Sequence, residues 1–263
     1  MMRMIGIEVR RCCARRLVRG LVALALFGCA LTAVLVYRAA ANDQTSDVFR
    51  LAELHQPPGD SILGMAAFFL VFGASLGGAS MIGAEWRAGT FVTLLTWEPA
   101  RRRVALAKLA ACGGVAAVIA LVLQGVFFAS FLPAALGPGT TEGVDAEWLR
   151  SIGGGAVRVA CMTGLVAVFM AAVAMIGRST AAALGFAFGY IILVENLLRA
   201  WKPWSGRFLL GENTARFVNG VELQDVEFSR STVAAGLTLA FYAALMATVA
   251  VVTFWRRDLA SAS

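Results

Sequence analysis

The sequence predicts an all-α integral membrane protein with six transmembrane helices. Apolar residues make up 59% of the 263-residue chain and charged residues only 15%. This balance leaves too little polar surface for a water-soluble domain of this length. The charges gather between long uncharged runs, and six of these runs come close to or exceed the roughly 20 residues that a helix needs to cross a bilayer. Short alternating segments, which would indicate a transmembrane barrel, do not occur.

The six apolar runs define the expected spans. They are Leu17–Tyr37, Ser61–Gly83, Val104–Leu132, Ile152–Ile176, Ala181–Leu198 and Thr232–Trp255. The first run has a basic start, as a signal peptide would, but its apolar stretch is longer than the roughly 7–15 residues of such a peptide. We therefore expect it to be retained, so that residues 17–255 form one six-helix transmembrane domain.

Two further elements are expected outside the spans. Within residues 1–16 the arginines lie opposite or beside one helical face, which predicts an amphipathic helix along the membrane surface. This face is shared by Met2, Ile5, Val9, Cys12 and Cys13. A disordered basic tail is the alternative. The loop 199–231 is rich in aromatic residues and predicts a short re-entrant or interfacial hairpin before the last helix.

The arginines predict the orientation of the spans. Six arginines lie in the first 19 residues, four more lie in the segment 84–103, and Arg256 begins the tail 256–263. The loops 38–60 and 137–151 carry more acidic than basic residues. Both termini and the segment 84–103 are therefore expected in the cytoplasm, although the extracytoplasmic loop 199–231 also carries positive charge. Basic residues that flank spans explain the net charge without any nucleic-acid partner.

Metal and redox chemistry find no support in the sequence. Three of the five cysteines lie inside spans, no C-x-x-C spacing occurs, and the single histidine, His55, has no second ligand nearby. We expect no metal site and no cofactor in this chain.

The chain also lacks the patterns of an enzyme. It contains no G-x-S-x-G, no H-E-x-x-H and no Ser-x-x-Lys constellation. The phosphate-binding pattern G-x-x-x-x-G-K-[ST] is absent, because the only lysines, Lys108 and Lys202, stand in other contexts. We expect no catalytic residues, and any nucleotide-driven activity would need a separate polypeptide.

Polar residues inside spans mark candidate pathways through a membrane. Arg158, Glu195 and Gln124 are expected at similar depth. They either form a polar cluster that lines a substrate route, or Arg158 and Glu195 extend to the membrane surface. Glycine pairs at small-xxx-small spacing, Gly73 with Gly77 and Gly185 with Gly189, predict close helix contacts within the chain or between two copies.

The segment between the second and third spans carries the most specific pattern. Glu85-x-Arg-x-Gly-Thr is followed by Leu-Leu-Thr, a proline, the run Arg101, Arg102 and Arg103, and then Lys108. This order resembles the signature of type-2 ATP-binding-cassette (ABC) transporter permeases. The Trp-Glu pair before the proline departs from many relatives but leaves the resemblance intact.

The resemblance implies a transport subunit of a bacterial plasma membrane. Two permease subunits, identical or different, would pair, and each would dock on an ABC ATPase subunit that binds ATP and Mg. The segment 84–103 would be the coupling helix, with contacts or geometry supplied by Glu85, Arg87, Gly89, Thr90 and Arg101–Arg103, although the arginine run could instead hold lipid phosphate. The cargo would be a hydrophobic or amphipathic drug, antibiotic, peptide or lipid. Alternatives are an ABC permease for ions or for maturation of an extracytoplasmic metalloenzyme, or a scaffold or receptor that does not transport.

Overall fold

The structure is a computed structural model that describes residues 2–42, 49–55, 62–90, 100–220 and 230–256. Six helical segments in this part of the chain are long and apolar enough to span a membrane, so the protein is an all-α, multi-pass membrane protein, as the sequence predicts. They are Arg16–Ala41, Gly64–Arg87, Arg101–Leu136, Ala146–Gly177, Thr180–Trp201 and Thr232–Arg256.

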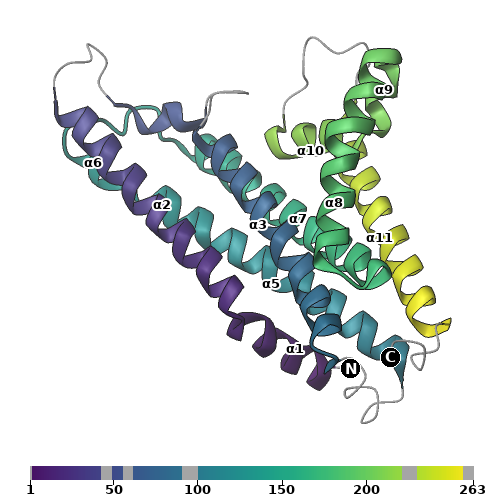
Figure 1. Cartoon of the computed structure of the whole chain (residues 1–263). Coiled ribbons are helices and arrows are strands. Elements are labelled where there is room, and N and C mark those ends of the chain that lie inside the picture. Colours follow the sequence, from purple (N-terminus) through teal and green to yellow (C-terminus); the bar gives the residue numbers. More distant parts are fainter. Residues whose placement is uncertain (1, 43–48, 56–61, 91–99, 221–229, 257–263) are drawn as a thin grey trace.

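Helix α7 (Ala146–Gly177) is the centre of the bundle. It packs against α3 (Ile62–Arg87), α5 (Arg101–Ala129) and α11 (Thr232–Arg256). In the most apolar stretch of α7, 67% of the residues are buried. In the corresponding stretch of α2 (Arg16–Ala41) none are buried. Helix α2 therefore lies at the edge of the bundle, where Figure 1 shows it opposite α8 and α11.

Close helix contacts occur at glycines, though not at the predicted pairs. A Cβ at Gly78 of α3 would lie 2.4 Å from the Ala167 carbonyl oxygen of α7, and one at Gly113 of α5 would lie 3.2 Å from the Gly164 carbonyl oxygen. Only a residue without a side chain allows such backbone proximity. The predicted pairs make no such contact with the described residues, because a Cβ at Gly73, Gly77, Gly185 or Gly189 would meet none of their atoms within 4 Å.

The N-terminal segment is helical, which excludes the disordered tail. Helix α1 (Met2–Ala14) ends in a sharp elbow at Arg15 and packs on α5. Figure 1 shows α1 at the same end of the bundle as the last turn of α11. The buried side of α1 includes Cys12 of the predicted apolar face and also Glu8, whereas Met2 and Cys13 of that face are exposed.

The segment expected to form a hairpin before the last span contains a 3₁₀ turn and one short α-helix, and its residues 221–229 lie outside the described residues. The fifth span comprises α8 (Thr180–Gly189), a π-helical turn (Tyr190–Glu195) and α9 (Asn196–Trp201). A 3₁₀ turn (Pro203–Phe208) and α10 (Leu210–Asn219) follow. Helix α10 packs against α11 and α7, so this segment is a folded part of the bundle.

The loops at the end opposite α1 form a small second core. It contains the 3₁₀ turn Leu51–His55 and α6 (Leu132–Leu136), and Phe131 and Trp148 are buried in it. The Trp148 indole donates to the Ala52 carbonyl oxygen over 3.1 Å. This core ties the loop after α2 to the loop before α7.

Candidate functional site: a buried charge network at the α1 end

Both ends of the segment 84–103 are described, but its middle is not. Helix α3 runs on to Arg87, so Glu85 lies in its last turn, and α5 begins at Arg101. Gly89 has a positive φ of 65°, and the Thr90 hydroxyl donates to the Glu85 carbonyl oxygen over 3.2 Å, which closes a turn after α3. Residues 91–99, where the core of the predicted coupling helix would fall, lie outside the described residues.

An ion pair that the sequence does not predict joins the end of α3 to the beginning of α5. The Lys108 Nζ lies 2.7 Å from the Glu85 Oε2, and the Lys108 side chain is completely buried. An unpaired ammonium at such a site would be very unfavourable, because burial removes its hydration. The carboxylate of Glu85 is therefore held toward α5.

Helix α1 supplies a second partner to the same lysine. The Lys108 Nζ also lies 2.9 Å from the Glu8 Oε2, and Glu8 is only 3% exposed. The other Glu8 oxygen is 3.3 Å from the half-exposed Arg11. The apolar pattern of α1 does not predict the burial of Glu8, because that burial depends on Lys108, a residue distant in sequence.

Arg15, at the elbow between α1 and α2, completes the network. Its guanidinium lies 2.9 Å from the Glu85 Oε1 and donates to the Ser80 carbonyl oxygen over 3.0 Å. Two carboxylates, Glu8 and Glu85, thus face two cations, Lys108 and Arg15. We call these four residues the charge network. Breaking such a buried arrangement by removing one partner typically costs about 3–5 kcal/mol.

Cys12 lies beside this network on α1. Burial, followed by the nearby Cys13, raises the pKa of the Cys12 thiol to about 11. Cys12 therefore stays a protonated, apolar side chain at neutral pH, although arginines surround it in the sequence.

Aromatic side chains join the same end of the bundle to the last span. The Arg102 guanidinium lies 3.8 Å from the centre of the Trp255 ring, at the end of α11. Trp86, next to Glu85, contacts Phe254 edge to face, with the two ring centres 6.2 Å apart. The Arg178 guanidinium lies 5.0 Å from the centre of the Trp86 ring. Cation–π contacts of this kind contribute about 0.5–2 kcal/mol each.

The other predicted coupling residues have varied surroundings. Arg87, Gly89, Thr90 and Arg103 are exposed, and Arg101 is half-buried. The predicted set thus falls into two groups: Glu85 is held inside the charge network, whereas the other residues are exposed or half-buried. Glu8, Arg15 and Lys108 belong with Glu85 but are missing from the predicted set. Two signals pointed to them: Glu8 is the only acidic residue in the first 42, and Lys108 is one of only two lysines.

The predicted polar residues of the spans do not converge on one another. The Gln124 side chain donates to the Ala120 and Ala156 carbonyl oxygens, at 3.1 and 3.2 Å, and so crosses from α5 to α7. Among the described ion pairs there is none between Glu195 and Arg158. Their charged groups lie instead at opposite ends of α10.

Glu195 lies at the N-terminus of α10 and Arg158 at its C-terminus, which is the order of charges that the helix dipole favours. The buried Glu195 accepts from the Gly211 N–H, in the first turn, at 2.8 Å. The Arg158 guanidinium lies against Gly220, which caps the last turn, so that a Cβ there would be 2.6 Å from an Arg158 nitrogen. A negative group at the N-terminus and a positive group at the C-terminus both stabilise a helix.

In the part of the chain that the structure describes, histidine, cysteine and carboxylate side chains nowhere gather in a group of three that could hold a metal ion. The fold and the six spans define the class of the protein, a multi-pass helical membrane protein. Comparison with protein families finds no family model that matches the chain, and a search of curated proteins finds no match.

Proposed function

We propose that this chain is the membrane-spanning subunit of an ATP-driven exporter of the type-2 ABC class. It would move a hydrophobic or amphipathic molecule with energy from a separate ATPase subunit. The proposal rests on the pattern from Glu85 to Lys108 and on the missing phosphate-binding loop. It places the α1 end of the bundle in the cytoplasm and pairs two such subunits.

The observation that carries the proposal is the position of Lys108. It is buried between Glu85, at the end of α3, and Glu8 on α1. A protein that pushes on the segment between α3 and α5 would therefore move α1 and two spans together. Rigid joints of this kind convert a local displacement into movement of whole helices.

The exposed residues supply the surface for such a partner. Arg87 and Arg103 stand on either side of the segment, where acidic ATPase residues can pair with them. Gly89 is exposed, and no atom of the described residues lies within 4 Å of a Cβ at this position. A partner surface can approach its backbone closely.

The test is reconstitution of the chain with an ABC ATPase subunit that copurifies with it. We expect the complex to hydrolyse ATP and to transport a compound that stimulates hydrolysis. Glu85→Ala should uncouple hydrolysis from transport while the complex still assembles, because the end of α3 loses its link to Lys108 and Arg15. Glu142→Ala, which removes an exposed carboxylate at the other end of the bundle, is the control.

Two variants of Gly89 separate the effect of added side-chain bulk at the joint from the effect of backbone strain at a positive φ. Gly89→Trp should uncouple in the same way because it adds bulk at the joint. Gly89→Asn should retain coupling, since asparagine tolerates a positive φ with little bulk. Unchanged transport in both Glu85→Ala and Gly89→Trp would overturn the assignment of the joint. Failure of any ATPase to copurify would favour the scaffold, and hydrolysis that no apolar compound stimulates would favour the ion or metalloenzyme-maturation alternative.

A further inference from the structure

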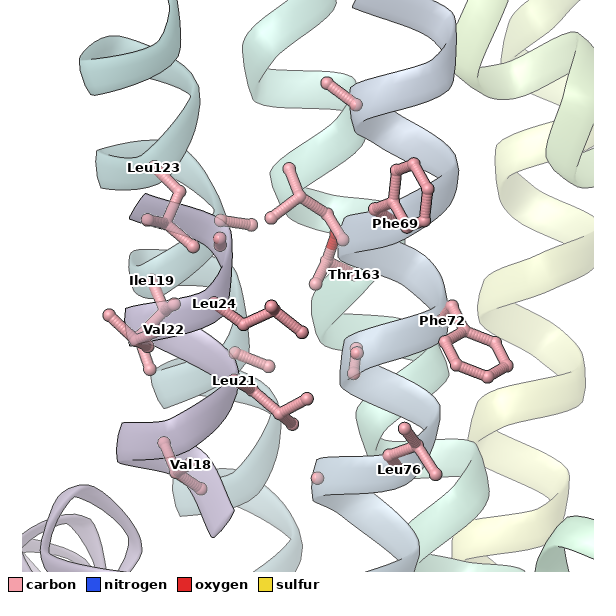
Figure 2. Close-up of a pocket in the computed structure, with 18 of the residues that line it drawn as sticks. Val18, Leu21, Val22, Leu24, Phe69, Phe72, Leu76, Ile119, Leu123 and Thr163 are labelled. Carbon is pink, nitrogen blue, oxygen red and sulfur yellow. The ribbon is translucent and has the colours of Figure 1, made fainter. Parts of the chain in front are cut away.

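A cavity of about 710 Å³ lies between α2 and α3 and is closed on its inner side by α5 and α7. Figure 2 shows Leu21 and Leu24 of α2 on one side, Phe69 of α3 on the other, and Thr163 of α7 behind. Leu24 and Phe69 line the cavity and yet are 66% and 64% exposed. The cavity is therefore reached from the side, between two spans, where a membrane protein meets lipid.

The walls of the cavity favour hydrocarbon. The lining consists almost entirely of alanine, glycine and larger apolar side chains. Its polar side chains are already bonded to helix backbone: Thr32 donates to the Gly28 carbonyl oxygen, Thr163 to that of Val159, and Gln124 to those of Ala120 and Ala156. An apolar cavity without polar partners does not hold water well and takes apolar ligands instead.

The cavity is long enough to hold a lipid chain. Its lining on α2 runs from Val18 to Thr32. At a rise of 1.5 Å per residue this stretch is roughly 21 Å long. One leaflet contributes about half of the roughly 30 Å hydrocarbon core, so an extended acyl chain lies comfortably along the cavity.

The α1 end of the cavity lies near basic residues. At the α1 end the lining includes Cys12 and Val18, and the exposed Arg16 and Arg19 lie in the same elbow and first turn of α2. At the other end it includes Phe127, which belongs to the small apolar core of the loops. Basic residues near the membrane surface attract anionic headgroups. An amphiphile therefore has one favoured direction in this cavity, with its head at the elbow.

We propose that this cavity binds one acyl chain of an anionic phospholipid from the leaflet at the α1 end, with the phosphate beside Arg16 and Arg19. The lipid supplies α2 with the packing that it lacks against the rest of the bundle. This site does not depend on the proposed transport activity, and its test needs no ATPase.

The first experiment fills the cavity. The full chain is reconstituted in vesicles of phosphatidylglycerol and phosphatidylcholine that carry a trace of phosphatidylglycerol with a photoreactive acyl chain. Cross-links are expected on lining residues of α2 and α3, and native mass spectrometry should detect a retained phosphatidylglycerol. The variant Gly73→Leu/Gly77→Leu should lose cross-linking and retention by about tenfold, because excluding even a pair of methylene groups costs this much affinity.

The control for the filled cavity uses the other predicted glycine pair. Gly185→Leu/Gly189→Leu adds the same bulk at two glycines that also meet nothing within 4 Å and that do not line the cavity. It should retain lipid as the wild type does. Far-ultraviolet circular dichroism and gel filtration check that both variants fold.

The second experiment tests the headgroup. Arg16→Gln/Arg19→Gln should remove the preference for phosphatidylglycerol over phosphatidylcholine, while Arg150→Gln/Arg256→Gln should keep it. Equal labelling of outward residues of α11, such as Leu237 and Phe241, would show an ordinary lipid annulus and overturn the proposal. If Gly73→Leu/Gly77→Leu changed the oligomeric state, the cavity would be occupied by a second copy of the chain and the proposal would be overturned. If this variant still retained phosphatidylglycerol, the lipid would bind elsewhere and the proposal would also be overturned.

Discussion

The Lys108 ammonium and the Glu85 carboxylate, 2.7 Å apart, join the second turn of α5 to the last turn of α3. This ion pair links the two spans on either side of the segment that connects them. Glu8 reaches the same ammonium from α1 at 2.9 Å. One buried lysine thus fixes the mutual position of three helices, and a change at this lysine should affect all three.

Lys108→Met should destabilise the protein strongly. The substitution keeps the length of the side chain but leaves Glu8 and Glu85 without their shared cation, which costs about 3–5 kcal/mol. Thermal unfolding in detergent measures the effect. Lys202→Met, at an exposed lysine, is the control and should change the midpoint little. Equal midpoints for the two variants would show that the buried lysine is not needed for stability.

Neutralising the carboxylates should recover part of this loss. In the triple variant Lys108→Met/Glu8→Gln/Glu85→Gln no uncompensated buried carboxylate remains. The cost should therefore be smaller than for Lys108→Met alone, because contacting residues are not additive. A triple variant that is less stable than Lys108→Met would mean that the carboxylates are stabilised mainly by Arg11 and Arg15.

Cys12 should react slowly with thiol reagents near neutral pH. Its pKa is raised to about 11 by burial, so that the reactive thiolate is rare below that pH. In a variant whose only cysteine is Cys12, alkylation should accelerate about tenfold per pH unit and should not level off by pH 10. The exposed Cys13, as the only cysteine, should react faster at pH 7.

The same shift has a consequence for stability. A thiol whose pKa is higher in the folded than in the unfolded protein stabilises the fold fully at pH values below the unfolded pKa. This contribution is lost as pH rises toward 11. The stability difference between the wild type and Cys12→Ala should therefore be constant at neutral pH and shift against the wild type above about pH 9, near the ordinary pKa of a thiol. A difference that does not change with pH would contradict the raised pKa.

Glu195→Ala should loosen α10. The change removes the acceptor of the Gly211 N–H and the negative charge at the N-terminus of the helix, which together cost about 1–2 kcal/mol. Hydrogen exchange in residues 210–219 should become faster. Glu142→Ala, which removes an exposed carboxylate outside α10, is the control. Equal exchange in the two variants would show that Glu195 does not hold α10.

Gly78→Ala should destabilise the contact between α3 and α7. The added methyl group would lie 2.4 Å from the Ala167 carbonyl oxygen, and neither backbone can yield without moving a whole helix. A loss of about 1–3 kcal/mol is expected for such overpacking. Gly73→Ala, where the methyl group meets nothing within 4 Å, should be close to neutral in the same unfolding measurement.

The sequence by itself determined the membrane class, the six spans and the helix at the N-terminus, because hydrophobic length and periodicity are local properties that a bilayer reads directly. It also pointed to Glu85, through a local pattern. Only the tertiary structure decided what Glu85 contacts, because Lys108 and Glu8 reach it from distant parts of the chain. For the same reason the sequence did not reveal that the charged groups of Glu195 and Arg158, expected either in one polar cluster or at the membrane surface, lie at opposite ends of α10. Burial of a charge depends on partners that folding brings together, and a linear sequence does not record that proximity.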